Sequence, residues 1–261
     1  ERMDGLLRKR AQDLYGIVNG IDYEELNPAT DKYIYHNYTA ESIDVKKENK
    51  KALQQEMGLP VSDKPLIGII TRLVDQKGLD LIAEIFEQIM NLDVQFVLLG
   101  TGEDHYQKLF AELKMKYPQQ TAANIGFNVE LAQKIYAGSD IFLMPSRFEP
   151  CGLSQMISLR YGTIPLVRSV GGLADTIEDY NPEAETGNGF SFKPYHAQDL
   201  LNTITRAVGI YRQRPELWQR LVDRAMKSDF SWERSAKEYV DTYRKAIDKN
   251  LTASHKHRAI I

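Results

Sequence analysis

A glutamate stands between two predicted structural elements at residues 145–156, which read Pro-Ser-Arg-Phe-Glu-Pro-Cys-Gly-Leu-Ser-Gln-Met. The apolar run before it, residues 141–144, is typical of a buried parallel strand, and residues 153–161 suit a helix. Free backbone N–H groups and the helix dipole attract anions to a helix start. We therefore expect Glu149 to lie beside a bound phosphate, in a site for phosphate and sugar chemistry.

Two cations follow an earlier apolar run. Residues 66–70 are apolar, Arg72 and Lys77 come next, and a helical pattern covers 79–90. Arginine can grip a diphosphate through its planar fork and lysine can do so as a compact charge, and both stay protonated at neutral pH. The alternative is that both are solvated loop charges, as most loop charges are.

Short apolar runs alternate with helical patterns along the chain, which predicts an α/β fold with a doubly wound, Rossmann-like parallel sheet. The expected strands are 65–71, 94–99, 122–127, 141–145, 164–168 and the weaker 188–192. The expected helices lie near 79–90, 104–117, 129–138, 153–162, 171–179 and 197–212. Ligands of such a sheet bind at the carboxyl ends of the strands, where Arg72, Gly100, Phe127 and Glu149 all fall. A Lys- and Glu-rich helical piece around 45–57 is expected on the outside.

Composition indicates a soluble, cytoplasmic protein. The chain has 261 residues, a net charge of -3 and no block of like charges, so nucleic acid and anionic membranes are poor partners. No apolar run approaches the roughly 18 residues of a spanning helix, and the first residues lack a signal-peptide core. The single cysteine, Cys151, cannot form an internal disulfide.

The sequence predicts neither a metal nor a cofactor. The five histidines are scattered and none has zinc-site spacing with cysteine. Gly100 and Gly102 follow an apolar run as in a dinucleotide fingerprint, but His105 stands where the third glycine belongs. We expect this loop either to shape a nucleotide pocket or to be a tight turn.

The motifs of this chain resemble those of bacterial glycogen synthases and plant starch synthases, and they follow one another in the same order. The resemblance covers almost the whole chain and is carried by residues 16–30, Arg72 with Lys77, Gly126-Phe127, 146–153 and 171–176. Related transferases carry a second glutamate eight positions after the first, and here that position is Ile157. Ordered motifs at matching spacing multiply each other's specificity.

The resemblance implies a retaining glucosyltransferase of the GT-B fold, which passes glucose from ADP-glucose to the 4-hydroxyl of an α-1,4-glucan. Arg72, Lys77 and Glu149 are then the catalytic candidates, the two cations for the departing diphosphate and Glu149 for the sugar. Glu149 could instead merely complement the helix dipole. Phe127 would stack on the base or, alternatively, be a core residue. The other residues expected to bind the nucleotide sugar are Cys151, Gly152, Leu153 and Ser154.

The resemblance also implies that an N-terminal domain of the same enzyme is missing here, so that the isolated chain is inactive. Residues 1–63 would be a lead-in and linker segment with an outer helix, 64–230 the nucleotide-sugar-binding domain, 231–250 a helix that crosses to the missing domain, and 251–261 a tail. That helix has an apolar stripe at helical spacing. The alternative is that the stripe packs on this same domain.

Two rival functions stay open. A nucleotide-sugar epimerase of the same architecture would need acid/base groups near the sugar. Glu149 alone is weak evidence for such groups. A non-catalytic nucleotide-binding or glucan-binding module would need no such groups.

Overall fold

The computed structural model describes residues 3–258, with side chains described as far as residue 251. The chain divides into two compact units. One unit is the continuous segment Tyr23–Ser228, and the other combines the residues before Tyr23 with those after Ser228.

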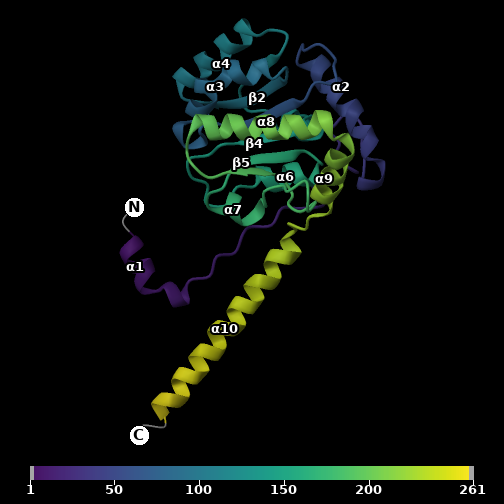
Figure 1. The fold of residues 1–261 in the computed structure, drawn as a ribbon. Coiled ribbons are helices and arrows are strands. Elements are labelled where there is room, and N and C mark those ends of the chain that lie inside the picture. Colours follow the sequence, from purple (N-terminus) through teal and green to yellow (C-terminus); the bar gives the residue numbers. More distant parts are fainter. Residues whose placement is uncertain (1–2, 259–261) are drawn as a thin grey trace. The chain divides into compact units, whose positions relative to one another are not determined.

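The larger unit is built on a six-stranded parallel sheet with the order β3-β2-β1-β4-β5-β6 (Figure 1). This order reverses between β1 and β4, which makes the sheet doubly wound with its switch point there. The predicted fold class is confirmed. The strands are β1 Leu66–Leu73, β2 Gln95–Gly102, β3 Thr121–Ile125, β4 Ile141–Met144, β5 Ile164–Arg168 and β6 Phe190–Phe192.

Helices flank the sheet, and α8 lies in front of it in Figure 1. They are α3 Leu79–Asn91, α4 Asp104–Lys116, α5 Val129–Gly138, α6 Ser154–Arg160, α7 Gly172–Thr176, α8 Ala197–Gln213 and α9 Pro215–Lys227. Two short 3-10 helices, η2 Ala40–Val45 and η3 Asp75–Lys77, interrupt the loops. Helix α9 was not predicted, although Pro215 at its first turn and a buried face that includes Leu217 and Leu221 are ordinary helix signals.

The core follows from the uniformly apolar strands. Ile67, Leu98, Phe142 and Leu166, each from a different strand, are fully buried. Strands covered on both faces need no alternation of polar and apolar residues, which is why these segments read as short continuous apolar runs. Such rigid strands fix the positions of the loops that follow them.

The helical piece expected around 45–57 is helix α2, Lys46–Glu56, which has exposed residues such as Lys47 and Glu48 as well as a buried face. It packs against α5, and five of its residues are buried, including Lys46, Asn49 and Lys50. Leu53 is fully buried and fits against Gly138, where a side chain would come within 2.8 Å of it. The burial of its lysines was not predicted, because these lysines remain buried through hydrogen bonds that composition does not reveal.

The segment before α2 belongs to the same compact unit as the sheet. Tyr161, which follows α6, donates from its hydroxyl to Asp31 at 2.6 Å. Its carbonyl accepts from the hydroxyl of Tyr38 at 2.7 Å. Residues 23–63, which we predicted as part of a lead-in segment, are therefore built into this unit by buried polar contacts.

The smaller unit consists of α1 Asp4–Lys9, η1 Ala11–Asp13 and the long helix α10 Trp232–Arg258. Ile21 pairs with Ser231 in an isolated bridge, and the hydroxyl of Ser235 donates to the carbonyl of Val18 at 2.8 Å. Residues 259–261 of the predicted tail lie outside the described residues. None of the helices described is long and apolar enough to cross a bilayer.

Large apolar side chains remain exposed along α10. The set comprises Trp232, Tyr239, Val240, Tyr243, Ile247 and Leu251. These positions recur at helical spacing and therefore form one stripe, as the sequence predicted.

Candidate active site

Arg72, Lys77 and Glu149 meet where β1 and β4 end. Arg72 is the second-last residue of β1, Lys77 closes η3, and Glu149 lies in the loop after β4. A cavity of about 200 Å³ opens here and is lined by Arg72, Lys77, Ser146 and Ser154, among others. The carboxyl edge at the switch point is where doubly wound sheets bind their ligands. The two motifs found separately in the sequence thus form one site.

Lys77 and Glu149 form an ion pair in this structure. Lys77 Nζ lies 2.6 Å from Glu149 Oε2, and the same oxygen accepts from the Ser146 hydroxyl at 3.2 Å. The Glu149 residue is only 9% exposed, and these two partners offset the cost of burying its carboxylate. Lys77 is therefore not a solvated loop charge.

Arg72 lies on the strand and not on the loop where we expected it. Its side chain is exposed and donates to Gln76 Oε1 at 3.4 Å. Gln76 also joins the two loops of the site, because it donates to the carbonyl of Phe148 at 3.1 Å and accepts from the backbone of Arg147 at 2.8 Å. This role could not be predicted, because Gln76 lies about seventy positions before Phe148 in the chain.

Two glycines let other backbone segments approach the loop that carries Glu149. Gly78 has φ +72°, and a Cβ there would lie 2.1 Å from the carbonyl oxygen of Pro145. Gly171 has φ +50°, and a Cβ there would lie 2.2 Å from the carbonyl oxygen of Glu149. Any side chain at either position would force the loop to move. The loop is therefore positioned by direct backbone contact.

The predicted helix start is present, and helix α6 begins at Ser154. Cys151, Gly152 and Ser154 are half-buried and Leu153 is exposed, and of the four only Ser154 lines the cavity. Burial raises the pKa of Tyr136 to about 12, and a side-chain hydrogen bond with Ser154 opposes that rise.

Gln155, which the sequence analysis did not single out, holds this turn from inside the protein. It is fully buried and donates to the carbonyls of Cys151 at 3.1 Å and Gly152 at 2.9 Å. A glutamine four positions after the cysteine is a signal that could have been noticed, because such a side chain can reach back to the residues before a helix.

Phe127 is 88% exposed, so the alternative interpretation of this residue as part of the core is wrong. It lies between β3 and α5, and the next residue, Asn128, caps α5 by accepting from the backbone of Leu131 at 2.9 Å. The ring does not line the 200 Å³ cavity. It is free to contact a flat ligand beyond the end of the sheet.

Asp75, Glu103 and His105 come together at the surface near η3, with potential ligand atoms within 4.8 Å of one another. Histidine and cysteine spacing does not reveal this group, because two of its three members are carboxylates. All three residues are exposed, and the Asp75 carboxylate already accepts from the hydroxyl of Tyr106 at 2.7 Å. Exposed acidic groups of this kind are common without a metal ion.

Comparison with known proteins places these features in a family context. Residues 50–226 match the family described as Glycosyl transferases group 1. A glycogen synthase from Desulforudis audaxviator (strain MP104C) is 59% identical over 95% of this chain and 50% of that protein. A glycogen synthase from Thermosipho africanus (strain TCF52B) is 58% identical over 95% of this chain and 52% of that protein. The resemblance predicted from the motifs is confirmed.

Structural comparison agrees. The solved catalytic domain of Starch Synthase IV from Arabidopsis thaliana, bound to ADP and acarbose, is 38% identical with a TM-score of 0.88. The match covers 94% of this chain and 52% of that one. The chain spans about half the length of the curated relatives it matches.

Proposed function

This chain belongs to the group 1 glycosyl transferases, and from that premise we propose that it is the donor-binding part of a glycogen synthase. The proposed donor is ADP-glucose, and the proposed reaction passes glucose, with retention of configuration, to the 4-hydroxyl of an α-1,4-glucan. One observation carries the proposal: Arg72, Lys77 and Glu149 converge at the switch point of the sheet. The ADP bound to the related starch synthase supports an adenine nucleotide.

Charge development in the reaction explains the proposed roles. When the nucleoside diphosphate departs from the glucosyl group, negative charge develops on the distal phosphate and the sugar becomes cationic. Arg72 and Lys77 can stabilise the phosphate, and the N–H groups at the start of α6 can contact it from the other side. Glu149 is placed to bind glucose hydroxyls and to favour the cationic sugar. Interactions that strengthen as charge develops accelerate the chemical step.

The ion pair between Lys77 and Glu149 suggests how the site changes on binding. A diphosphate that enters the cavity competes with Glu149 for the ammonium group of Lys77. The carboxylate then loses its cationic partner and can turn to the sugar. We propose no metal and no cofactor in this step, because the two cations supply the charge that a bridging metal supplies elsewhere.

The rest of the enzyme is proposed to supply the acceptor side. The chain covers about half of its relatives, and α10 carries an exposed apolar stripe from Trp232 to Leu251. Exposed apolar surface of this extent marks an interaction site. We propose that the stripe packs on the missing N-terminal domain and that the isolated chain transfers essentially no glucose.

Calorimetric titration of this chain with ADP and ADP-glucose tests donor binding. Arg72→Ala and Lys77→Ala should each weaken binding, whereas Arg220→Ala, which removes an exposed arginine paired with Glu185, should not. Unchanged affinity in both site variants would refute the proposed donor site.

The reaction itself is tested with the full-length parent, ADP-glucose and glycogen. Glucan elongation supports the proposal, an epimerised sugar would indicate the rival enzyme, and binding without turnover would indicate a binding module. Robust elongation by the 261-residue chain alone would refute the argument that the acceptor side is missing.

A further inference from the structure

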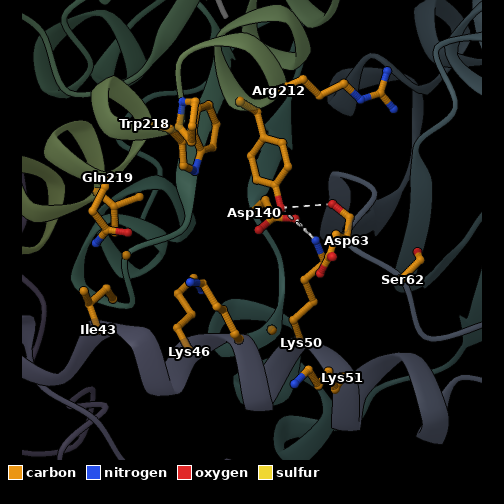
Figure 2. A pocket seen from close by; sticks show the side chains of 16 residues that line it. Ile43, Lys46, Lys50, Lys51, Ser62, Asp63, Asp140, Arg212, Trp218 and Gln219 are labelled. Carbon is orange, nitrogen blue, oxygen red and sulfur yellow. Dashed lines mark hydrogen bonds and ion pairs between the residues drawn. The ribbon is translucent and has the colours of Figure 1, made fainter.

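A second cavity lies at the amino ends of the strands, and Figure 2 shows the side chains that line it. Its volume is about 560 Å³, which falls in the range of small-molecule sites. Asp63, Asp140 and Gly162 line it and precede β1, β4 and β5 respectively. The cavity at Arg72 and Lys77 lies at the carboxyl ends of the strands, and the two cavities share no lining residue.

Cations outnumber carboxylates around this second cavity. Five basic side chains line it against two carboxylates, namely Lys46, Lys47, Lys50, Lys51 and Arg212 against Asp63 and Asp140. Three of the cations, Lys47, Lys51 and Arg212, also form ion pairs with carboxylates that do not line the cavity, namely Asp44, Glu48 and Asp93, so the excess of positive charge holds for the lining itself. A concave surface lined by one sign of charge concentrates ligands of the opposite sign.

Two of the lysines are buried, but only one has a counter-charge. Lys50 Nζ lies 2.7 Å from Asp140 Oδ2. Lys46 Nζ donates to uncharged oxygens, at 2.7 Å to the carbonyl of Ala137 and 2.7 Å to the hydroxyl of Thr163. Within the described part of the chain, Lys46 forms no ion pair. Figure 2 shows both lysines extending from α2 into the cavity.

A buried ammonium group without a counter-charge is costly. Burial lowers the pKa of Lys46 to about 7. The nearby ammonium group of Lys50 also lowers this pKa, whereas the carboxylate of Asp140 raises it. The Ala137 carbonyl lies at the end of α5. The hydrogen bond that Lys46 donates to this carbonyl caps the helix end and offsets part of the cost of burying the ammonium group. The other charged or titratable groups around it are Asp63, Tyr211 and Arg212 on the cavity wall and the ring of Tyr38 at 6.0 Å. An anion in the cavity would supply the missing counter-charge.

The remaining walls suit the body of an organic ligand. Trp218 and Tyr211 contribute an aromatic wall, with their rings edge to face at 5.2 Å. The hydroxyl oxygen of Ser62 is buried at the rim and has no hydrogen-bond partner among the described residues. Gln219 adds an exposed amide. These groups can accept hydrogen bonds from the hydroxyl groups of a ligand and donate hydrogen bonds to them.

We propose that this cavity binds a small organic phosphate. Its phosphate lies among the lysines of α2, and its hydroxyl-bearing body lies against Trp218 and Tyr211. Lysine ammonium groups are compact charges suited to phosphate oxygens. The site is separate from the proposed donor site, so the two proposals can fail independently.

Titration with inorganic phosphate tests the proposal through the fluorescence of Trp218. Replacement of the chain's other tryptophan, Trp232→Phe, makes that signal specific. We expect a saturable change that persists in Arg72→Ala, which removes a cation from the donor site. The double variant Lys47→Ala/Lys51→Ala removes only exposed lysines and should weaken binding at least about tenfold.

Lys227→Ala is the matched control, because Lys227 is likewise an exposed helical lysine in an ion pair but does not line the cavity. It should leave the affinity for phosphate unchanged. The proposal is overturned if phosphate gives no saturable signal, if the double variant binds as tightly as the wild type, or if the control weakens binding equally.

A proton-linkage measurement tests whether the anion reaches the environment of Lys46. Sulfate is used because it does not titrate near neutrality, and calorimetry is performed at about pH 8 in two buffers of different ionisation enthalpy. The wild type should take up protons as sulfate binds, and Lys46→Met should not. Sulfate binding without proton uptake by the wild type would overturn the role of Lys46. If Lys46→Met does not fold, the phosphate affinity of Lys47→Ala/Lys51→Ala still tests whether the site exists.

Discussion

Truncation of Phe127 gives the sharpest test of how the proposed nucleotide is held. The side chain is 88% exposed, so Phe127→Ala removes little buried area and should change the free energy of unfolding by no more than about 0.5 kcal/mol. A ring that stacks on adenine should instead show its loss in binding, by roughly 1–3 kcal/mol. That corresponds to a decrease in ADP affinity of about 5-fold to 150-fold.

The assay compares a ligand that has a base with one that lacks it. ADP and glucose 1-phosphate each displace a fluorescent ADP analogue from the chain, so that only binding at the donor site is counted. Phe127→Ala should weaken ADP and leave glucose 1-phosphate almost unchanged. Met115→Ala, a truncation of another exposed apolar side chain, should alter neither affinity. Urea unfolding of each variant measures the stability.

Two results would refute the reasoning. If ADP binds Phe127→Ala as tightly as the wild type, the ring does not contact the base. If both ligands weaken together and the free energy of unfolding drops by several kcal/mol, the side chain supports the fold, as a core aromatic would.

Three further predictions concern the cations, the loop glycines and the buried lysine. Arg72→Ala and Lys77→Ala in the full-length parent should each lower kcat by about 10²–10³ with a smaller change in KM, and near-normal kcat in steady-state kinetics would assign that residue to the solvated surface. Gly171→Ala should lower the free energy of unfolding by about 1–3 kcal/mol through its backbone conformation alone. In the same urea titration Gly209→Ala, with nothing within 4 Å, should be neutral or stabilising. Burial lowers the pKa of Lys46 to about 7, so above that pH the unfolded chain binds more protons than the folded chain. Stability relative to Lys46→Met should then rise by up to about 1.4 kcal/mol per pH unit from about pH 7 towards 10, and parallel curves for the two proteins would contradict this.

Periodicity in the sequence predicted most of the large unit, because its strands are short apolar runs and most of its helices are amphipathic. The range 164–168 is a strand and 129–138 a helix, as expected. The environment of α2 could not be predicted in this way. Its buried lysines reach carbonyls of residues far along the chain, such as Ala137, and only the folded chain brings these groups together.

The candidate site, too, could be predicted only in part from the sequence. Residue types and positions indicated Arg72, Lys77 and Glu149, since each follows or ends a predicted strand. The ion pair between Lys77 and Glu149 was not predicted, because it depends on the approach of two loops. Gln76 was missed for a related reason, because its amide joins a backbone carbonyl about seventy positions away, whereas the spacing of Gln155 from Cys151 was a usable signal.

The loop that carries Glu149 is held by its own carbonyl groups against Gly78 and Gly171, two residues without side chains. Contacts of this kind do not depend on which side chains the loop itself displays. Exposed positions such as Phe148 and Leu153 can therefore be exchanged in a combinatorial library while the frame of the loop is kept. Selection from such a library, with both glycines left untouched, offers a route to altered sugar preference in an otherwise unchanged scaffold.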